Sequence, residues 1–158
     1  MLRKRIILFL ATGDTCRSPM AEGLLQAMSA LKTDRRVNVS SAGTHAIYGN
    51  RPLDLAVQVM QEWKIDISGH RARMLTKPMV KESDLILVME KAHLTYIRFM
   101  PFFGMKKVRL VREFDAPGDS ADVPDPMGGD LEMYRASALL LKDCLKGVRA
   151  YLENTLQI

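Results

Sequence analysis

The sequence predicts an α/β fold: a three-layer, doubly wound domain built on a four-stranded parallel sheet. Two observations support this. Strand-like segments alternate along the chain with segments of helical apolar spacing, and strands that alternate with helices pair in parallel through right-handed crossovers. Two of the strand segments are unbroken apolar runs, as expected for strands buried on both faces. The four predicted strands lie at residues 6–10, 36–44, 84–90 and 106–111.

Five helices are predicted between and after these strands, at residues 19–31, 52–63, 78–83, 91–100 and 131–154. Ser18 is available as N-cap of the first, with Pro19 at its first helical position. A long polar loop at 113–130, with four acidic residues from Asp115 to Asp125, precedes the last helix. Ligands of such sheets bind beyond the carboxyl ends of the strands, so this loop should meet the loop after the first strand.

Length and composition predict one domain over residues 1–158 and exclude several classes of protein. A net charge of +5 suits an anionic ligand, but there is no basic run typical of nucleic-acid binding. The apolar run of 6–11 is too short for a signal peptide or a membrane span, which predicts a cytoplasmic protein with no membrane partner. Cys16 and Cys144 form neither a disulfide framework nor a metal-binding motif, so no metal or other cofactor is expected.

Residues 11–18, "ATGDTCRS", have the composition of an anion-binding loop. Gly13 lets several backbone N–H groups converge on one anion, and the following helix directs its positive end there. The Arg17 guanidinium adds a fork of donors that matches phosphate. The alternative is an ordinary strand-to-helix turn with an exposed arginine. The phosphate-binding residues are predicted to be Thr12, Gly13, Asp14, Thr15, Cys16 and Arg17.

This loop resembles that of the low-molecular-weight protein tyrosine phosphatases, whose pattern is C-x-G-N-x-C-R-S-P. The resemblance extends over nearly the whole chain, in the family's order and spacing. Thioredoxin-coupled arsenate reductases share the fold and the loop, but they need downstream redox cysteines, and here only Cys144 lies downstream. The further matching segments are 41–44, 67–75, 84–90 and 118–129.

The resemblance implies a role for four positions. The nucleophilic cysteine of the family falls on Ala11 and its phosphate-binding arginine on Arg17. The serine that lowers the pKa of the thiolate falls on Ser18, and the general acid of the D-P motif falls on Asp125. In that chemistry a thiolate attacks phosphorus, the loop stabilises the equatorial oxygens, and the acid protonates the leaving phenolate.

Two departures affect this machinery. The methyl group of Ala11 cannot attack phosphorus, and removing the nucleophile in a comparable mechanism costs on the order of 10⁶ in kcat. Cys16 lies to one side of the in-line position and is expected to pack behind the loop. Asp14 replaces the family's asparagine; aspartate tolerates left-handed geometry, but its charge about 6 Å from a phosphate would repel it by roughly 3 kcal/mol. Asp14 therefore either points into hydrogen bonds with its own loop or weakens phosphate binding.

Around the pocket, Ile47 and Tyr48 fall where the family places one wall, and Met127 follows the D-P motif. Tyr48 can stack on a phosphotyrosine ring or be an ordinary surface tyrosine. His70 is interpreted as a structural residue that supports the loop region.

Three functions remain open from the sequence. The first is a protein that binds phosphate, or a phosphotyrosine-containing protein, without covalent turnover because Ala11 replaces the nucleophile. The second is an active phosphotyrosine phosphatase in which Ala11 is an engineered substitution. The third is an interaction or regulatory protein that has lost anion binding. The oligomeric state is left open.

Overall fold

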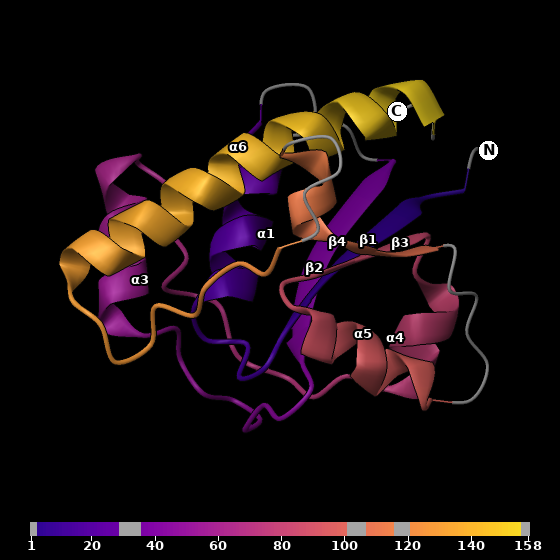
Figure 1. The fold of residues 1–158 in the computed structure, drawn as a ribbon, viewed down its shortest axis with the longest axis horizontal. Coiled ribbons are helices and arrows are strands. Elements are labelled where there is room, and N and C mark those ends of the chain that lie inside the picture. The colour runs from indigo at the N-terminus through magenta and orange to yellow at the C-terminus, as the bar shows by residue number, and fades with distance from the viewer. Residues whose placement is uncertain (1–2, 29–35, 101–106, 116–120, 156–158) are drawn as a thin grey trace.

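The computed structural model describes residues 3–28, 36–100, 107–115 and 121–155 and has a single four-stranded sheet within them (Figure 1). All three strand pairings are parallel, in the order β2-β1-β3-β4. The predicted α/β fold is thereby confirmed. The strands are β1 (Arg5–Ala11), β2 (Val37–Gly43), β3 (Leu85–Val88) and β4 (Val108–Leu110).

Helices cover both faces of this sheet, which makes three layers (Figure 1). One face carries α1 (Arg17–Ala27), α3 (Asp54–Glu62) and the long α6 (Leu131–Thr155). The other face carries α4 (Lys77–Glu82) and α5 (Lys91–Arg98). A short 3₁₀ helix, η2 (Val111–Phe114), follows β4. Among the described residues, no helix combines the length and apolarity needed to cross a membrane.

The central strand β1 is apolar throughout because its two faces point into two separate cores. Ile7, Phe9 and Ala11 pack in the cluster with α1, α3 and α6. Leu8 and Leu10 pack in the cluster with α4 and α5. Successive side chains of a strand point to opposite faces, so a strand between two helical layers needs apolar residues at every position.

The first helix begins earlier than the sequence predicted. It starts at Arg17 with Cys16 as the N-cap residue, so Ser18 is not the N-cap and Pro19 is not its first residue. Ser18 lies inside the first turn, where its hydroxyl is used by Asp14 instead of by the backbone. Residues 29–31 of this predicted helix, residue 106 of the predicted fourth strand and residues 116–120 of the acidic loop lie outside the described residues. The fourth strand is shorter than predicted because the chain turns into η2 at Val111.

The end of β1 lies against the end of β2, and Gly43 permits this close approach. Ala11 pairs with Gly43 in the parallel register. A Cβ atom at Gly43 would lie 2.4 Å from the Thr12 carbonyl oxygen and 2.9 Å from Ala46 Cβ. Only glycine fits there without displacing the backbone, so Gly43 fixes where the loop after β1 begins.

Candidate anion-binding site

The anion loop, residues 11–18, connects β1 to α1 and is held from outside by its carbonyl groups. The backbone N–H groups of Thr44, His45 and Leu53 donate to the carbonyls of residues 11, 12 and 15, at 2.9, 2.9 and 3.0 Å. By contrast, the N–H groups of residues 12–16 donate to no backbone carbonyl of the described residues. A loop with tethered carbonyls and free N–H groups at a helix N-terminus is suited to bind an anion.

Asp14 has a left-handed backbone conformation, with φ of 57°, which aspartate tolerates. Its carboxylate is buried and accepts hydrogen bonds from α1 and from the segment that contains Arg73. Ser18 Oγ donates to Oδ1 at 2.7 Å, and the backbone N–H of Arg73 donates to Oδ2 at 3.1 Å. His70 Nε2 donates to the Asp14 carbonyl oxygen at 2.8 Å. Of the two alternatives for Asp14, the structure has the one in which the side chain is hydrogen-bonded within its own loop, to Ser18, and it adds a bond from Arg73 of another segment.

Arg17, predicted to bind phosphate, is buried with only 2% of its surface exposed. Its Nη1 pairs with Glu90 Oε1 and donates to the Val123 carbonyl at 2.8 Å. Its Nη2 lies 3.5 Å from Asp125 Oδ2. The guanidinium is thus fixed in place from the end of β3 and from the acidic loop.

Asp125 lies beside Arg17 because the acidic loop is anchored at the end of the sheet. The Val123 N–H donates to the Met89 carbonyl at 2.8 Å, just after β3. Asp125 Oδ1 accepts from the Met127 N–H at 3.1 Å, a turn that orients the carboxyl group. The loops after β1 and after the last strand therefore meet beyond the carboxyl ends of the strands, as expected for this sheet.

Ala11 ends β1 with only 3% of its surface exposed. Its methyl group has no acidic proton and no lone pair, so this position provides no nucleophile. Ser18 follows in the first turn of α1, and its hydroxyl is directed to Asp14. The structure thus places both residues at the anion loop, but the serine donates to a carboxylate.

Cys16 packs behind the anion loop, as expected. Its Sγ lies 3.6 Å from Tyr134 Oη on α6. Burial raises the pKa of the Cys16 thiol above its usual value, which outweighs the hydrogen bonds from Tyr134 and Thr15. A buried thiol with a raised pKa is a poor nucleophile at neutral pH.

His93, in the first turn of α5, also reaches the anion loop. Its Nδ1 accepts from the Glu90 backbone N–H at 3.1 Å, so the proton of the neutral ring is on Nε2. That nitrogen lies 2.9 Å from Thr12 Oγ1 and donates to it. Burial, together with the positive charge of Arg17, lowers the pKa of His93 to about 4. His93 is therefore neutral at physiological pH.

The three residues predicted to form the pocket wall are exposed. Tyr48 is 87% exposed, Ile47 69% and Met127 56%. Asp125, beside Arg17, is also exposed.

Sequence reasoning missed several residues of the site. Glu90 and the Val123 carbonyl hold Arg17, His93 holds Thr12, and Arg73 holds Asp14 through its backbone. Arg73, Glu90 and Val123 lie in the segments 67–75, 84–90 and 118–129, which match the family pattern. That match was the only indication in the sequence that these residues belong to the site. Their roles depend on contacts between segments that are remote along the chain, which spacing alone does not reveal. In the ranges that the structure describes, no three His, Cys, Asp or Glu side chains are grouped so as to hold a metal ion.

Comparison with known proteins shows the family of the chain. The family model of low molecular weight phosphotyrosine protein phosphatase matches residues 6–157. The protein-arginine-phosphatase of Bacillus subtilis is 33% identical over 94% of this chain and 97% of its own. The protein-tyrosine-phosphatase Wzb of Escherichia coli is 33% identical over 86% of this chain and 87% of its own. The crystal structure of the low molecular weight protein tyrosine phosphatase from T. tengcongensis has a TM-score of 0.85 at 36% identity, covering 94% of this chain and all of that one (100%). The chain therefore belongs to the low molecular weight phosphotyrosine protein phosphatase family.

Proposed function

We propose that this chain binds phosphate, or the phosphate group of a phosphorylated protein, in the anion loop without turning it over through a covalent intermediate. The observation behind this proposal is the combination of Ala11 with a set of groups suited to bind an anion. Arg17 is fixed by two carboxylates and a carbonyl, and the loop N–H groups are left free of backbone partners in the described part of the chain. Donors held in place before the ligand arrives are suited to bind a phosphate group.

The lost step is the attack on phosphorus. A phosphatase of this family needs an atom at position 11 that can form a bond to phosphorus, and a methyl group has none. Cys16 does not take over, since its thiol is buried beside Tyr134. Electrostatic binding by Arg17 and the loop N–H groups needs no nucleophile, so binding survives while turnover does not.

The phosphorylated side chain belongs to one of two classes, because the relatives are named as tyrosine phosphatases and as arginine phosphatases. Exposed Tyr48 and Ile47 favour an aromatic ring, which stacks on a tyrosine or packs on an isoleucine. The exposed Asp125 carboxylate beside Arg17 favours a guanidinium group, whose N–H groups it can accept. Peptides of both kinds are therefore needed in the test.

Two other functions would lead to different results. If Ala11 is engineered, the gene has a cysteine codon at this position and the natural protein is a phosphatase. If the fold serves only as an interaction surface, millimolar phosphate does not raise the melting temperature. A ligand at 100 times its Kd adds about 2.7 kcal/mol to the free energy of unfolding, which is easily measured.

The test measures binding and turnover on the same protein. Calorimetric titration with phosphate, a phosphotyrosine peptide and a phosphoarginine peptide should show binding, while an aryl phosphate releases no phosphate. Arg17→Ala should lose binding. Arg149→Ala is the matched control, because this arginine is exposed on α6 and pairs only with Glu153 in the described part of the chain. Unchanged binding by Arg17→Ala would refute the site, and turnover by the unmodified chain would refute the mechanism.

A further inference from the structure

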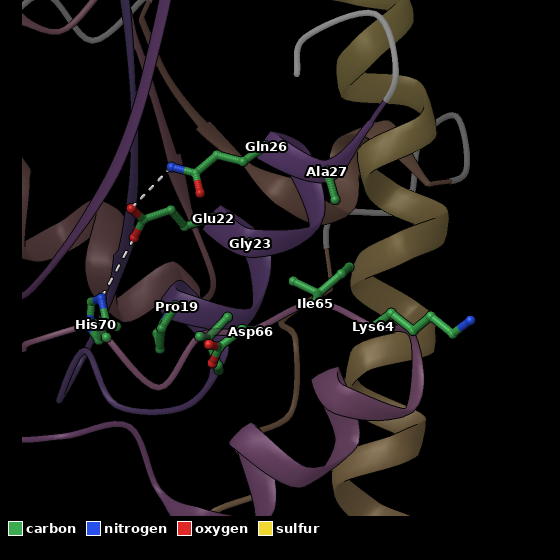
Figure 2. Close-up of a pocket in the computed structure, with 11 residues that line it drawn as sticks. Pro19, Glu22, Gly23, Gln26, Ala27, Lys64, Ile65, Asp66 and His70 are labelled. Atoms are coloured by element: carbon green, nitrogen blue, oxygen red, sulfur yellow. Dashed lines mark hydrogen bonds and ion pairs between the residues drawn. The ribbon is translucent and has the colours of Figure 1, made fainter. Parts of the chain in front are cut away.

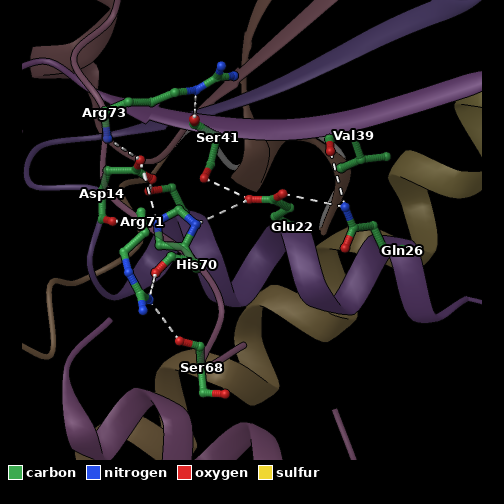
Figure 3. A network of polar contacts seen from close by, with 10 residues as sticks. Asp14, Glu22, Gln26, Val39, Ser41, Ser68, His70, Arg71 and Arg73 are labelled. Atoms are coloured by element: carbon green, nitrogen blue, oxygen red, sulfur yellow. Dashed lines mark hydrogen bonds and ion pairs between the residues drawn. The ribbon is translucent and has the colours of Figure 1, made fainter. Parts of the chain in front are cut away.

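Asp14 places a carboxylate inside the polar network below the anion loop (Figure 3). Its side chain has no exposed surface. The two groups that donate to it, the Ser18 hydroxyl and the Arg73 backbone N–H, are both neutral. Hydrogen bonds from neutral donors do not cancel a carboxylate charge, so the negative charge of Asp14 opposes an anion bound in the loop.

The side chain of His70 faces this carboxylate and a second one. Nε2 lies 3.5 Å from Asp14 Oδ2 and donates to the Asp14 carbonyl. Nδ1 lies 3.7 Å from Glu22 Oε2 on α1. Both ring nitrogens therefore face acceptors, and only the imidazolium form has a proton on each. The arrangement of acceptors thus selects the charged ring.

Two other charged residues lie near His70, and of these the anionic Glu22 favours the charged ring. Arg73 lies on the same segment. Its backbone N–H donates to the Asp14 carboxylate, and its guanidinium donates to the Ser41 carbonyl oxygen. Glu22 accepts from the Ser41 hydroxyl at 2.8 Å. Burial lowers the pKa of His70, but the hydrogen bonds and charge of Asp14, with the charge of Glu22, outweigh it and raise the pKa above its ordinary value.

We propose that His70 is a positioning residue whose positive charge offsets the Asp14 carboxylate, so that a loop with aspartate at this position can still hold an anion. The proposal rests on the proposed function, because it takes the bound anion to be the phosphate group named there. The sequence suggested only a structural role for His70, and the proposal gives this residue an electrostatic role. Asp14 and His70 then act as a unit, and changing one should alter the effect of changing the other.

His70 can exchange its proton with solvent even though it is mostly buried. It lines a cavity of about 510 Å³ beside α1, together with Glu22 and Gln26 (Figure 2). Lys64 and Asp66 also line this cavity, from the segment that follows α3. Raising the pH through the pKa of His70 should therefore remove its charge and weaken anion binding.

Sulfate is the suitable probe, because its charge stays constant over the pH range in which phosphate itself titrates. The affinity for sulfate is measured for the unmodified chain, Asp14→Asn, His70→Gln and the double variant. Glutamine keeps a donor for the Asp14 carbonyl but has no charge. We expect H70Q to weaken binding at least tenfold when Asp14 is present, and less than threefold in the D14N background. Equal losses in both backgrounds would overturn the proposal.

A second readout does not depend on anion binding. The titration of His70 is followed by NMR, with its signal assigned as the one that H70Q lacks. In Asp14→Asn the proton affinity of His70 should fall at least tenfold. The control is Asp143→Asn, the same change at an exposed position of α6, which should leave the proton affinity of His70 unaltered. An unaltered His70 titration in D14N overturns the proposal whether or not sulfate binds. If the unmodified chain binds no sulfate but His70 titrates at a lower pH in D14N, the proposed function is overturned and the charge pairing of His70 with Asp14 is upheld.

Discussion

Ser18 Oγ lies 2.7 Å from Asp14 Oδ1 and donates its only proton to that carboxylate. A hydroxyl donates one hydrogen bond, so Ser18 has no proton left for an atom at position 11. In the family pattern, this serine lowers the pKa of the nucleophilic thiolate. Ala11 and Asp14 are therefore two separate departures, and both affect the same step.

Restoring the nucleophile should restore only part of the chemistry. We expect no measurable aryl phosphate hydrolysis by the unmodified chain, slow hydrolysis by Ala11→Cys, and at least tenfold faster hydrolysis by the variant A11C/D14N. The second change replaces a charged acceptor with a neutral amide oxygen, which competes less strongly with a thiolate for the Ser18 proton, and a hydrogen bond to a charged group is worth about 1.5–3 kcal/mol. The measurements are kcat and the pH dependence of thiol alkylation.

The single variant D14N is the control, since without a thiol it should stay inactive. Equal kcat values and equal thiol pKa values for A11C and A11C/D14N would show that Ser18 is not diverted by Asp14. If neither A11C nor A11C/D14N hydrolyses the aryl phosphate, further positions of the pocket also differ from those of an active phosphatase.

Gly43 should be intolerant of even one methyl group. A Cβ there would lie 2.4 Å from the Thr12 carbonyl oxygen, which is backbone and cannot move aside without displacing the loop. We expect Gly43→Ala to lower the free energy of unfolding by about 1–3 kcal/mol, as overpacking does, and to weaken phosphate binding. Gly69→Ala is the matched control, because a Cβ atom at Gly69 would meet nothing within 4 Å beyond its chain neighbours. Urea denaturation of both variants decides the point, and equal stabilities would contradict it.

His93 should make the protein less stable in mild acid. Its pKa is lowered to about 4 in the folded protein from an ordinary 6.5, so between these values the unfolded chain binds the proton and the folded chain does not. The free energy of unfolding should fall as the pH drops from about 6.5 to 4, by up to about 3 kcal/mol from this residue. Denaturation at several pH values is compared with His93→Gln, which should lose this part of the slope. Identical slopes would show that His93 titrates normally.

Tyr48 should contribute to peptide binding more than to phosphate binding. It is 87% exposed, and an aromatic contact adds about 0.5–1.5 kcal/mol. Tyr48→Ala should therefore weaken a phosphotyrosine peptide about two- to tenfold, and inorganic phosphate less. Phe99→Ala, an equally exposed aromatic residue at the end of α5, is the control. Equal affinities of Y48A and the unmodified chain for the peptide would place the ring outside the binding surface.

The order of strands and helices, the parallel sheet and the family were within reach of the sequence. Apolar runs, helical spacing and the loop "ATGDTCRS" are local patterns, and the residues that form them are close along the chain. The same locality explains the error at Ser18. Capping preferences describe the backbone of one helix end, and they take no account of a carboxylate that competes for the same hydroxyl.

Only the tertiary structure decided which partners hold the site. Arg17 meets Glu90 and the Val123 carbonyl, and His70 meets Asp14 and Glu22, because crossover connections bring the ends of different strands to one edge of the sheet. The sequence by itself determined that position 11 has no nucleophile, since this depends on one side chain's chemistry. Whether the charge of Asp14 is compensated depends on distances between segments that are remote in sequence, and only folding sets those distances.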